Sequence, residues 1–225
     1  MPREPLWLFT ALVIVVGTWG FIKLSSEVIE GDTQAFDEWA IRLLRQPDDL
    51  SKPIGPAWLA EAGRDVTGLG GVVVLTLVTL AVAGFLRIIR GYRMLILLLV
   101  TTTTGIALSM LLKEFFSRER PNIVPHLSHV YTSSFPSGHS MMSAVVYLTL
   151  ASVVAATLTQ RPLKIYVFAI AFTLIILVGL SRVYMGVHYP TDVLAGWTAG
   201  IVWALLAGKI TSWLIHQGAV EPPQD

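Results

Sequence analysis

Long apolar stretches separated by short charged segments are the main pattern of this chain. A helix that crosses the ~30 Å hydrocarbon core of a bilayer needs roughly 20 predominantly apolar residues. Six stretches approach that length. We predict a membrane-spanning helix in each of them: Leu6–Ile22, Gly68–Leu86, Met94–Leu112, Ser140–Leu158, Ile165–Leu180 and Val193–Ile215.

The composition agrees with this pattern. Apolar residues make up 54% of the chain and charged residues 14%, and the mean hydropathy is +0.66, which is outside the usual range of soluble domains. We therefore predict an all-α polytopic membrane protein that forms a single domain over residues 1–225. The first apolar stretch lacks a small-x-small cleavage site, so we expect a retained anchor and not a signal peptide.

Charge and cysteine content exclude several classes of function. The net charge is +1 and no long basic run is present, so we expect no nucleic-acid partner. Cysteine is absent, which excludes disulfides, thiolate metal sites and cysteine nucleophiles.

The distribution of charge between the spans predicts an orientation. Two short turns carry bases and no acid, namely Arg87, Arg90 and Arg93 in one and Arg161 and Lys164 in the other. The positive-inside rule places these turns, and both termini, in the cytoplasm. The long connection Lys23–Asp65 then lies outside, and its nine acids against five bases agree with that side.

Three clusters of polar residues fall in connections that this topology places on the outer face. Lys113–Arg120 and Pro136–His139 lie between the third and fourth spans, and Arg182–Asp192 lies between the fifth and sixth. Ionisable groups at membrane depth are costly unless they are paired or solvated, so they are candidates for function. We expect the three clusters to meet in one outer pocket.

The cations of these clusters suit a phosphate. Arg120 and Arg182 offer planar forks of N–H donors, and Lys113 acts as a point charge. For Arg118 we favour the simpler interpretation, in which it snorkels from a helix end to the interface. The Ser137–Gly138 turn adds backbone N–H groups at a helix start, where anions bind.

His188 and Asp192 are four residues apart, with Pro190 between them at a position typical of a first helical turn. Asp192 could accept a proton from one imidazole nitrogen and leave the other as a nucleophile. Alternatively, Asp192 is a helix cap and His188 an interfacial polar residue. If the two histidines divide the work, His188 attacks phosphorus and His139 protonates the leaving group. The nearby cations oppose a divalent metal ion, so we expect neither metal nor cofactor.

The remaining features are less specific. Residues 32–45 have apolar side chains at helical spacing, with Asp37, Glu38, Arg42 and Arg45 on the opposite side. This pattern suits an interfacial helix that acts as a cap over the bundle or as a lipid gate, and we favour the cap. The last span carries a stripe of small residues that predicts close helix packing, namely Gly196, Gly200, Ala204 and Gly208. We interpret His126 and His129 as exposed loop residues.

At these clusters the sequence resembles the type 2 phosphatidic acid phosphatase (PAP2) superfamily, which shares its site with vanadium haloperoxidases. The resemblance rests on three linked motifs within residues 113–192. They read Lys113 with Arg120-Pro121, then Pro136-Ser137-Gly138-His139, then Ser181-Arg182 with His188 and Asp192. Every position matches the family pattern in identity and spacing.

The resemblance implies a haloperoxidase-like helical bundle and a phosphohistidine intermediate on His188, which Asp192 orients. His139 would be the acid and then the base. Phosphate would be held by the remaining motif residues, namely Lys113, Arg120, Ser137, Gly138 and Arg182.

It also implies metal-independent hydrolysis of a lipid phosphate or pyrophosphate at the outer face of a bacterial inner membrane. Undecaprenyl pyrophosphate, phosphatidylglycerophosphate, phosphatidate and lipid A are the candidate substrates. The alternatives are a non-catalytic lipid-phosphate carrier and, less in keeping with six spans, a vanadate-dependent peroxidase. We expect specificity to lie in Asn122–Phe135 and Lys23–Asp65. The oligomeric state is left open.

Overall fold

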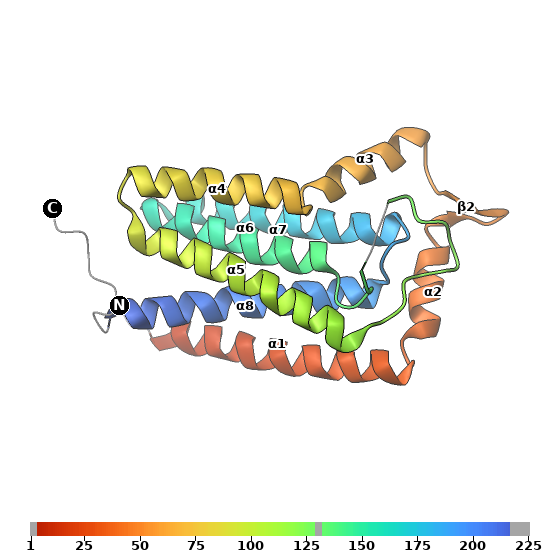
Figure 1. Cartoon of the computed structure of the whole chain (residues 1–225), viewed down its shortest axis with the longest axis horizontal. Coiled ribbons are helices and arrows are strands. Elements are labelled where there is room, and N and C mark those ends of the chain that lie inside the picture. The colour runs from red at the N-terminus through yellow and green to blue at the C-terminus, as the bar shows by residue number, and fades with distance from the viewer. Residues whose placement is uncertain (1–3, 129–131, 217–225) are drawn as a thin grey trace.

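A computed structural model describes residues 4–128 and 132–216, which form a bundle of long helices with smaller elements at one end (Figure 1). The helices in chain order are α1 (Glu4–Glu30), α2 (Gln34–Arg42), α3 (Ala57–Gly68), α4 (Val72–Ile88), α5 (Tyr92–Phe116), α6 (Gly138–Thr157), α7 (Arg161–Tyr184) and α8 (Pro190–His216). Between α2 and α3, the strands β1 (Arg45–Gln46) and β2 (Asp49–Pro53) form an antiparallel pair.

The predicted membrane spans correspond to long helices. Among the described residues, α1, α5, α6, α7 and α8 are each long and apolar enough to cross a membrane. The second predicted span corresponds to α4, which pairs with α3 across a 44° bend to give up to six spans. The prediction of an all-α polytopic membrane protein is confirmed. The separate helix α3 was not predicted from the sequence.

The bend between α3 and α4 lies in a glycine-rich segment, where the chain comes close to other helices. A Cβ on Gly70 would lie 2.4 Å from Cγ1 of Val178 on α7 and 3.3 Å from the carbonyl oxygen of His139 on α6. Such distances leave no room for a side chain. The break therefore brings the α3–α4 corner against the start of α6.

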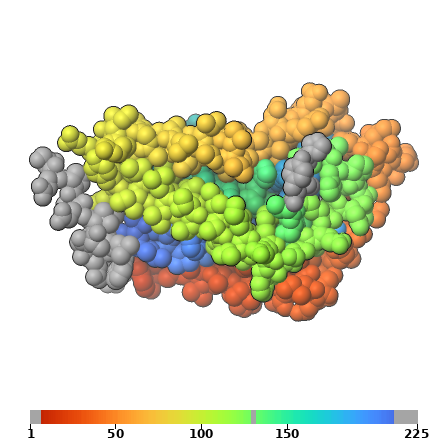
Figure 2. Space-filling model, viewed as in Figure 1, coloured from red at the N-terminus to blue at the C-terminus, as the bar shows by residue number. Residues whose placement is uncertain are grey.

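Helix α6 is the centre of the bundle. In its most apolar 18-residue window 61% of residues are buried, against 6% for α1. Figure 2 shows one side of the molecule, where α1, α4 and α5 form most of the surface and α6 and α8 emerge only between them. Leu75, Tyr147 and Ile175, from three different helices, meet in one buried apolar cluster. The start of α6 is thus held from several sides.

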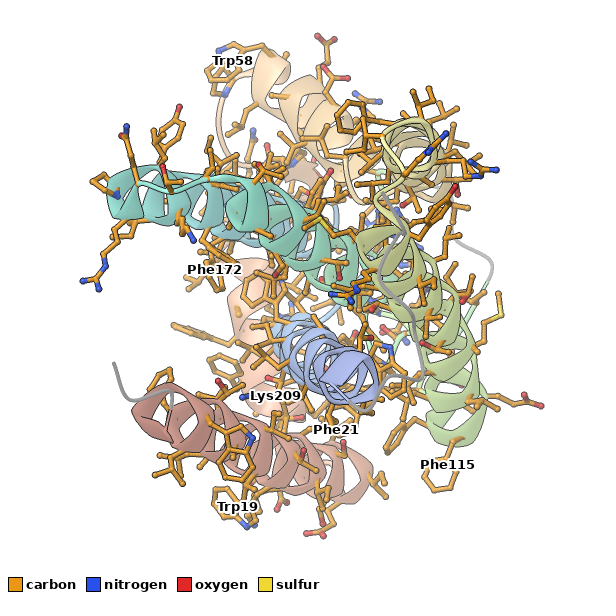
Figure 3. All side chains as sticks on the ribbon, turned by 90° about the vertical axis from the view of Figure 1, so that its left-hand side faces the viewer. Trp19, Phe21, Trp58, Phe115, Phe172 and Lys209 are labelled. Carbon is orange, nitrogen blue, oxygen red and sulfur yellow. The ribbon has the colours of Figure 1, made fainter. Side chains whose placement is uncertain are left out.

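The outer surfaces of the long helices are apolar, as expected for helices that face lipid. Trp19 on α1 is 67% exposed and Phe115 on α5 is 78% exposed. Both side chains point away from the bundle when it is viewed along its length (Figure 3). A soluble protein rarely leaves contiguous apolar surface on this scale, so these surfaces are suited to hydrocarbon.

The stripe of small residues on α8 packs against α6 over part of its length. A Cβ on Gly196 would lie 2.6 Å from the carbonyl oxygen of Ser137, and one on Gly200 would lie 2.5 Å from that of Met141. A Cβ on Gly208 would meet nothing within 4 Å. The prediction of close packing is therefore confirmed for the first two glycines and wrong for Gly208, which lies beyond the contact.

Helix α2 lies across the end of the bundle, as a cap would (Figure 1). Its apolar side chains Phe36 and Trp39 are exposed by 49% and 57%, whereas Asp37 and Ile41 are completely buried. The face that bears Asp37, predicted to lie opposite the apolar residues, is the one turned toward the bundle. The physical reason is the ion pair of Asp37 with Arg118, which is described with the site below.

The two glycines give a matched test of the packing between α6 and α8. We expect Gly200→Ala to lower the free energy of unfolding by about 1–3 kcal/mol, because an added methyl group overpacks the contact. Gly208→Ala is the control, and it should leave stability unchanged or slightly raised. Unfolding in mixed detergent micelles measures both variants, and equal stabilities would contradict the close packing.

Candidate functional site

The three polar clusters of the sequence meet at the end of the bundle that α2 covers. There α5 and α7 end and α6 and α8 begin (Figure 1). The Ser137 N–H donates to the carbonyl oxygen of Asp192 at 2.9 Å, which joins the second cluster to the third. Arg120 approaches His188, which joins the first cluster to the third. The expected meeting in space is therefore observed.

The turn between α7 and α8 positions His188. Gly186 has a φ of +71°, a left-handed conformation that glycine adopts without steric cost. The Val187 N–H then donates back to the carbonyl oxygen of Arg182 at 3.3 Å. Pro190 begins α8, as the sequence predicted. His188 is fixed between the two helices with 1% of its surface exposed.

The neighbours of the His188 imidazole define its two nitrogens. Nδ1 lies 3.4 Å from Oδ2 of Asp192 and 3.4 Å from Oγ of Ser134. Ser134 donates its own proton to Asp192 Oδ2, so both neighbours of Nδ1 can accept. We therefore assign the proton to Nδ1. Nε2 keeps a free electron pair, which accepts from Nη1 of Arg120 at 3.1 Å.

Burial determines the charge of His188. Burial first, and then the positive charges of Arg120 and Arg182, lower the pKa of this imidazole to about 3. The hydrogen bond and the charge of Asp192 act in the opposite direction. His188 is therefore neutral at neutral pH, which is the state that a nitrogen nucleophile requires.

Cationic side chains surround the Nε2 side of the imidazole. Arg120 donates to three backbone carbonyl oxygens, through Nε to Thr132 at 2.8 Å, Nη1 to Val187 at 2.7 Å and Nη2 to Ser133 at 3.3 Å. Burial is the main reason that the pKa of Arg120 is lowered, but an arginine stays charged at any physiological pH. Lys113 Nζ donates to the carbonyl oxygen of Ser133 at 2.7 Å.

Arg182 completes the group of cations. Its side chain is 2% exposed, and its Nη1 donates to Oγ1 of Thr67 on α3 at 2.9 Å. Its buried Nε has no partner among the described residues. An unpaired buried N–H costs free energy, so this donor is available to an anion in the pocket.

The start of α6 lies against these cations. Ser137 is the N-cap, and its Oγ accepts from the Ser140 N–H at 3.4 Å. A Cβ on Gly138 would lie 3.1 Å from Cε of Lys113, so glycine lets the lysine cross the helix start. His139 lies within electrostatic reach of Arg182, His188 and Lys113. All eight residues predicted from the motifs thus line one site.

Arg118 does not snorkel, and the expectation that it would is wrong. Its side chain is 13% exposed and lies between two carboxylates, with Nη1 2.7 Å from Asp192 Oδ1 and Nη2 2.8 Å from Asp37 Oδ2. These acids raise the pKa of Arg118 against the opposing effect of burial. Two fully buried carboxylates require a cation, and this requirement overrides the tendency to reach water.

Four residues at the site were missed by the motifs: Asp37, Thr67, Arg118 and Ser134. Only Arg118 carried a usable signal, since it lies inside a charged cluster. The others come from segments whose approach depends on tertiary structure. His126 is held by the carbonyl oxygen of Pro121 at 2.7 Å, and His129 lies outside the described residues.

An open pocket of about 380 Å³ adjoins Lys113. It is lined by the end of α5 and the segment before α6, namely Met110, Lys113, Glu114, Ser117, Thr132 and Ser133. On the same helix, Met110 is 66% exposed, so the pocket is continuous with an apolar outer surface. The cationic centre thus has an apolar approach beside it.

Known proteins resemble this chain in sequence. The sequence model of the PAP2 superfamily matches residues 93–215. Phosphatidylglycerophosphatase B of Bacillus subtilis is 34% identical over 201 residues, which cover 88% of this chain and 90% of the relative. Lipid A 1-phosphatase of Rhizobium etli is 28% identical and covers 70% of this chain and 75% of the relative.

A solved structure gives the same result in three dimensions. The crystal structure of the transmembrane PAP2-type phosphatidylglycerolphosphate phosphatase from Bacillus subtilis superposes with a TM-score of 0.77 at 31% identity, covering 89% of this chain and 96% of that one. Together with the matched motifs and their meeting at one buried site, these similarities show that the chain is an integral membrane protein of the PAP2 phosphatase superfamily.

Proposed function

We propose that this protein hydrolyses a lipid phosphate without a metal ion, through a phosphohistidine on His188. The observation that carries the proposal is the geometry of His188. Nδ1 faces Asp192 and Ser134, and Nε2 faces Arg120 at 3.1 Å. The free electron pair of a neutral imidazole is therefore directed at the cations that would hold a phosphate.

In the first step, Nε2 of His188 attacks phosphorus and the bond from phosphorus to the lipid oxygen breaks. The negative charge of the bound phosphate offsets the neighbouring cations and favours a protonated His139, which donates its proton to that oxygen as it leaves. Positive charge develops on the imidazole, and Asp192 stabilises it through Nδ1–H. Lys113, Arg120 and Arg182, with the Ser137 hydroxyl and the backbone N–H of Gly138, stabilise the charge on the phosphoryl oxygens.

In the second step, a water oxygen attacks phosphorus and the bond to Nε2 breaks. His139, now neutral, accepts a proton from the water, and His188 regains its electron pair. Inorganic phosphate then leaves the site. Each proton thus has a stated donor and acceptor, and the residues end in their starting states.

For the substrate, phosphatidylglycerophosphate is the first candidate within the broader class of lipid phosphates and pyrophosphates. The relative of highest identity reported above is named for that activity. The apolar approach beside Lys113 suits a lipid whose phosphate reaches the cations while its chains stay in hydrocarbon. We further propose that residues 1–225 act as one catalytic domain with its motif core at residues 113–192.

The proposed location is the bacterial inner membrane, with both termini in the cytoplasm and the site facing the periplasm. The turns that carry Arg87 and Arg90 and then Arg161 lie at the end of the bundle opposite α2 (Figure 1). The positive-inside rule assigns that end to the cytoplasm. The acidic segment around α2 would then lie outside.

The proposal can be tested by phosphate release from phosphatidylglycerophosphate in detergent with EDTA. We expect the parent to retain full activity in EDTA, and His188→Ala to lose about 10³-fold or more, as for loss of a nucleophile. Lys164→Ala, at the opposite end of the bundle, is the control and should keep parent activity. Release by His188→Ala at the parent rate would refute the mechanism, and binding without release by either protein would favour a lipid carrier.

The role of His139 gives a second test, which uses an aryl phosphate whose leaving group needs no proton. We expect His139→Ala to form the phosphoenzyme with this substrate but to hydrolyse it slowly, because activation of water is lost. The measurement is a burst of phenol equal to the enzyme concentration, with acid-labile phosphate retained on the protein. A slow linear release without retained phosphate would contradict the dual role.

The neutral state of His188 has a consequence for stability at low pH. Its pKa is about 3 in the folded protein, and about 6.5 is expected for an unfolded histidine. Between these two pH values His188 binds a proton in the unfolded chain and not in the folded chain. The free energy of unfolding therefore decreases as pH falls from about 6.5 toward 3. Between about pH 7.5 and pH 5, we expect the parent to lose on the order of 2 kcal/mol more than His188→Gln. Thermal unfolding of both proteins at the two pH values measures this, and equal losses would contradict a neutral His188.

A further inference from the structure

A second buried carboxylate, Asp37 of α2, lies next to the site without being part of any motif. It is completely buried and accepts three hydrogen bonds from two partners. Arg118 Nη2 donates to its Oδ2 at 2.8 Å, the Thr191 N–H donates to its Oδ1 at 3.1 Å, and the Thr191 hydroxyl donates to Oδ2. A charged group with this many partners at full burial is held in a specific place.

Arg118 bridges this carboxylate to that of Asp192. Its Nη1 donates to Asp192 Oδ1 at 2.7 Å and to Thr191 Oγ1 at 2.9 Å. The guanidinium also lies 4.4 Å from the centroid of the Tyr189 ring. Both Nη groups of Arg118 are therefore engaged by protein partners. In contrast, Nε of Arg182 has no partner within the described part of the chain. Arg118 is therefore poorly placed to bind the phosphate itself.

The same contacts fix the orientation of the Asp192 carboxylate. Oδ1 is held by Arg118, while Oδ2 accepts from the Tyr189 N–H at 2.9 Å and from Ser134. With both oxygens held in this way, Oδ2 faces Nδ1 of His188. That contact is long, at 3.4 Å, so a small rotation of the carboxylate would lose it.

We propose that Asp37 and Arg118 are positioning residues, which act through Asp192 to fix the tautomer and orientation of His188. The inference rests on the proposed function, since it takes His188 as the nucleophile. It makes α2 a working part of the catalytic site. The fork of Arg118 is essential, because one guanidinium can join two carboxylates whereas a lysine acts as a point charge.

Positioning and phosphate binding differ in their kinetic signatures. A residue that acts through Asp192 lowers kcat and leaves KM and inhibition by inorganic phosphate unchanged, because the phosphate cradle is intact. A residue that touches the phosphate raises KM and weakens inhibition by inorganic phosphate. Two residues that act through the same contact also give effects that do not multiply.

The experiment compares Asp37→Asn, Arg118→Gln and the double variant with the parent, each checked by thermal unfolding in detergent. We expect each single change to lower kcat about 10- to 100-fold, the range typical of partners that orient a reactive group, with KM and the inhibition constant of inorganic phosphate within about twofold of the parent. The double variant should lose no more than the worse single one. Glu38→Gln is the matched control, because Glu38 neighbours Asp37 on α2 but is partly exposed and paired with Arg42 at 3.7 Å.

Three results would overturn the inference: parent kcat in folded Asp37→Asn, a rise in KM and in the inhibition constant of inorganic phosphate that parallels the loss of kcat, or multiplying effects in the double variant. If Asp37→Asn does not fold, Arg118→Lys carries the same test, since it keeps the buried charge and removes the fork. Activity in the parent and its absence in His188→Ala would leave the proposed function standing in each of these cases. A parent without phosphatase activity would instead refute the proposed function.

Discussion

The site depends on placing several charges at the end of a membrane bundle, where burial is costly unless each charge has a partner. Asp37 and Asp192 are both fully buried, and one guanidinium, that of Arg118, serves both. On the other side of His188, Lys113, Arg120 and Arg182 are not balanced by carboxylates in this way. Lys113 and Arg120 donate to backbone carbonyl oxygens. Arg182 donates to the hydroxyl of Thr67, and its Nε has no partner among the described residues. The imidazole therefore separates a region where charge is neutralised from one where an anion is still needed.

This division suits the role proposed for His188, a neutral histidine that attacks from within a cluster of cations. Burial removes a protonated His188 from water, and Arg120 and Arg182 repel its charge. For these two reasons the pKa of His188 is low. When a phosphate occupies the cationic side, the repulsion is relieved. The positive charge that forms on the imidazole during attack is then opposed by Asp192, whose position is already fixed. The arrangement of charges around His188 thus favours the neutral imidazole with which the proposed reaction begins.

The sequence was sufficient for the parts of this design that are local. The apolar stretches predicted the long helices, because membrane thickness sets their length. Motif spacing predicted the residues that meet, because His188 and Asp192 are one helical turn apart and the clusters share a face of the bundle. The sequence was insufficient where two distant segments pair. Nothing local indicates that Asp37 turns inward and Phe36 outward, since the reason is a guanidinium in the connection after α5. The expectation that Arg118 would snorkel to the interface was wrong for the same reason, because its carboxylate partners come from distant segments.

The same distinction bears on where substrate specificity arises. In the proposed function the motif residues contact phosphate oxygens, which all lipid phosphates share, and this chain resembles relatives that are named for different lipids. Discrimination must come from groups that touch the remainder of the lipid. Two elements are placed to do so. One is the pocket beside Lys113, whose wall includes the carboxylate of Glu114. The other is α2, which also reaches the site through Gln34, a donor to the Tyr189 hydroxyl at 3.2 Å. Helix α2 carries both Asp37 and the exposed Phe36 and Trp39. A change in how this helix contacts lipid would therefore move Asp37 and, through Arg118, Asp192. Under the proposed function, head-group selection and catalytic rate are coupled through α2.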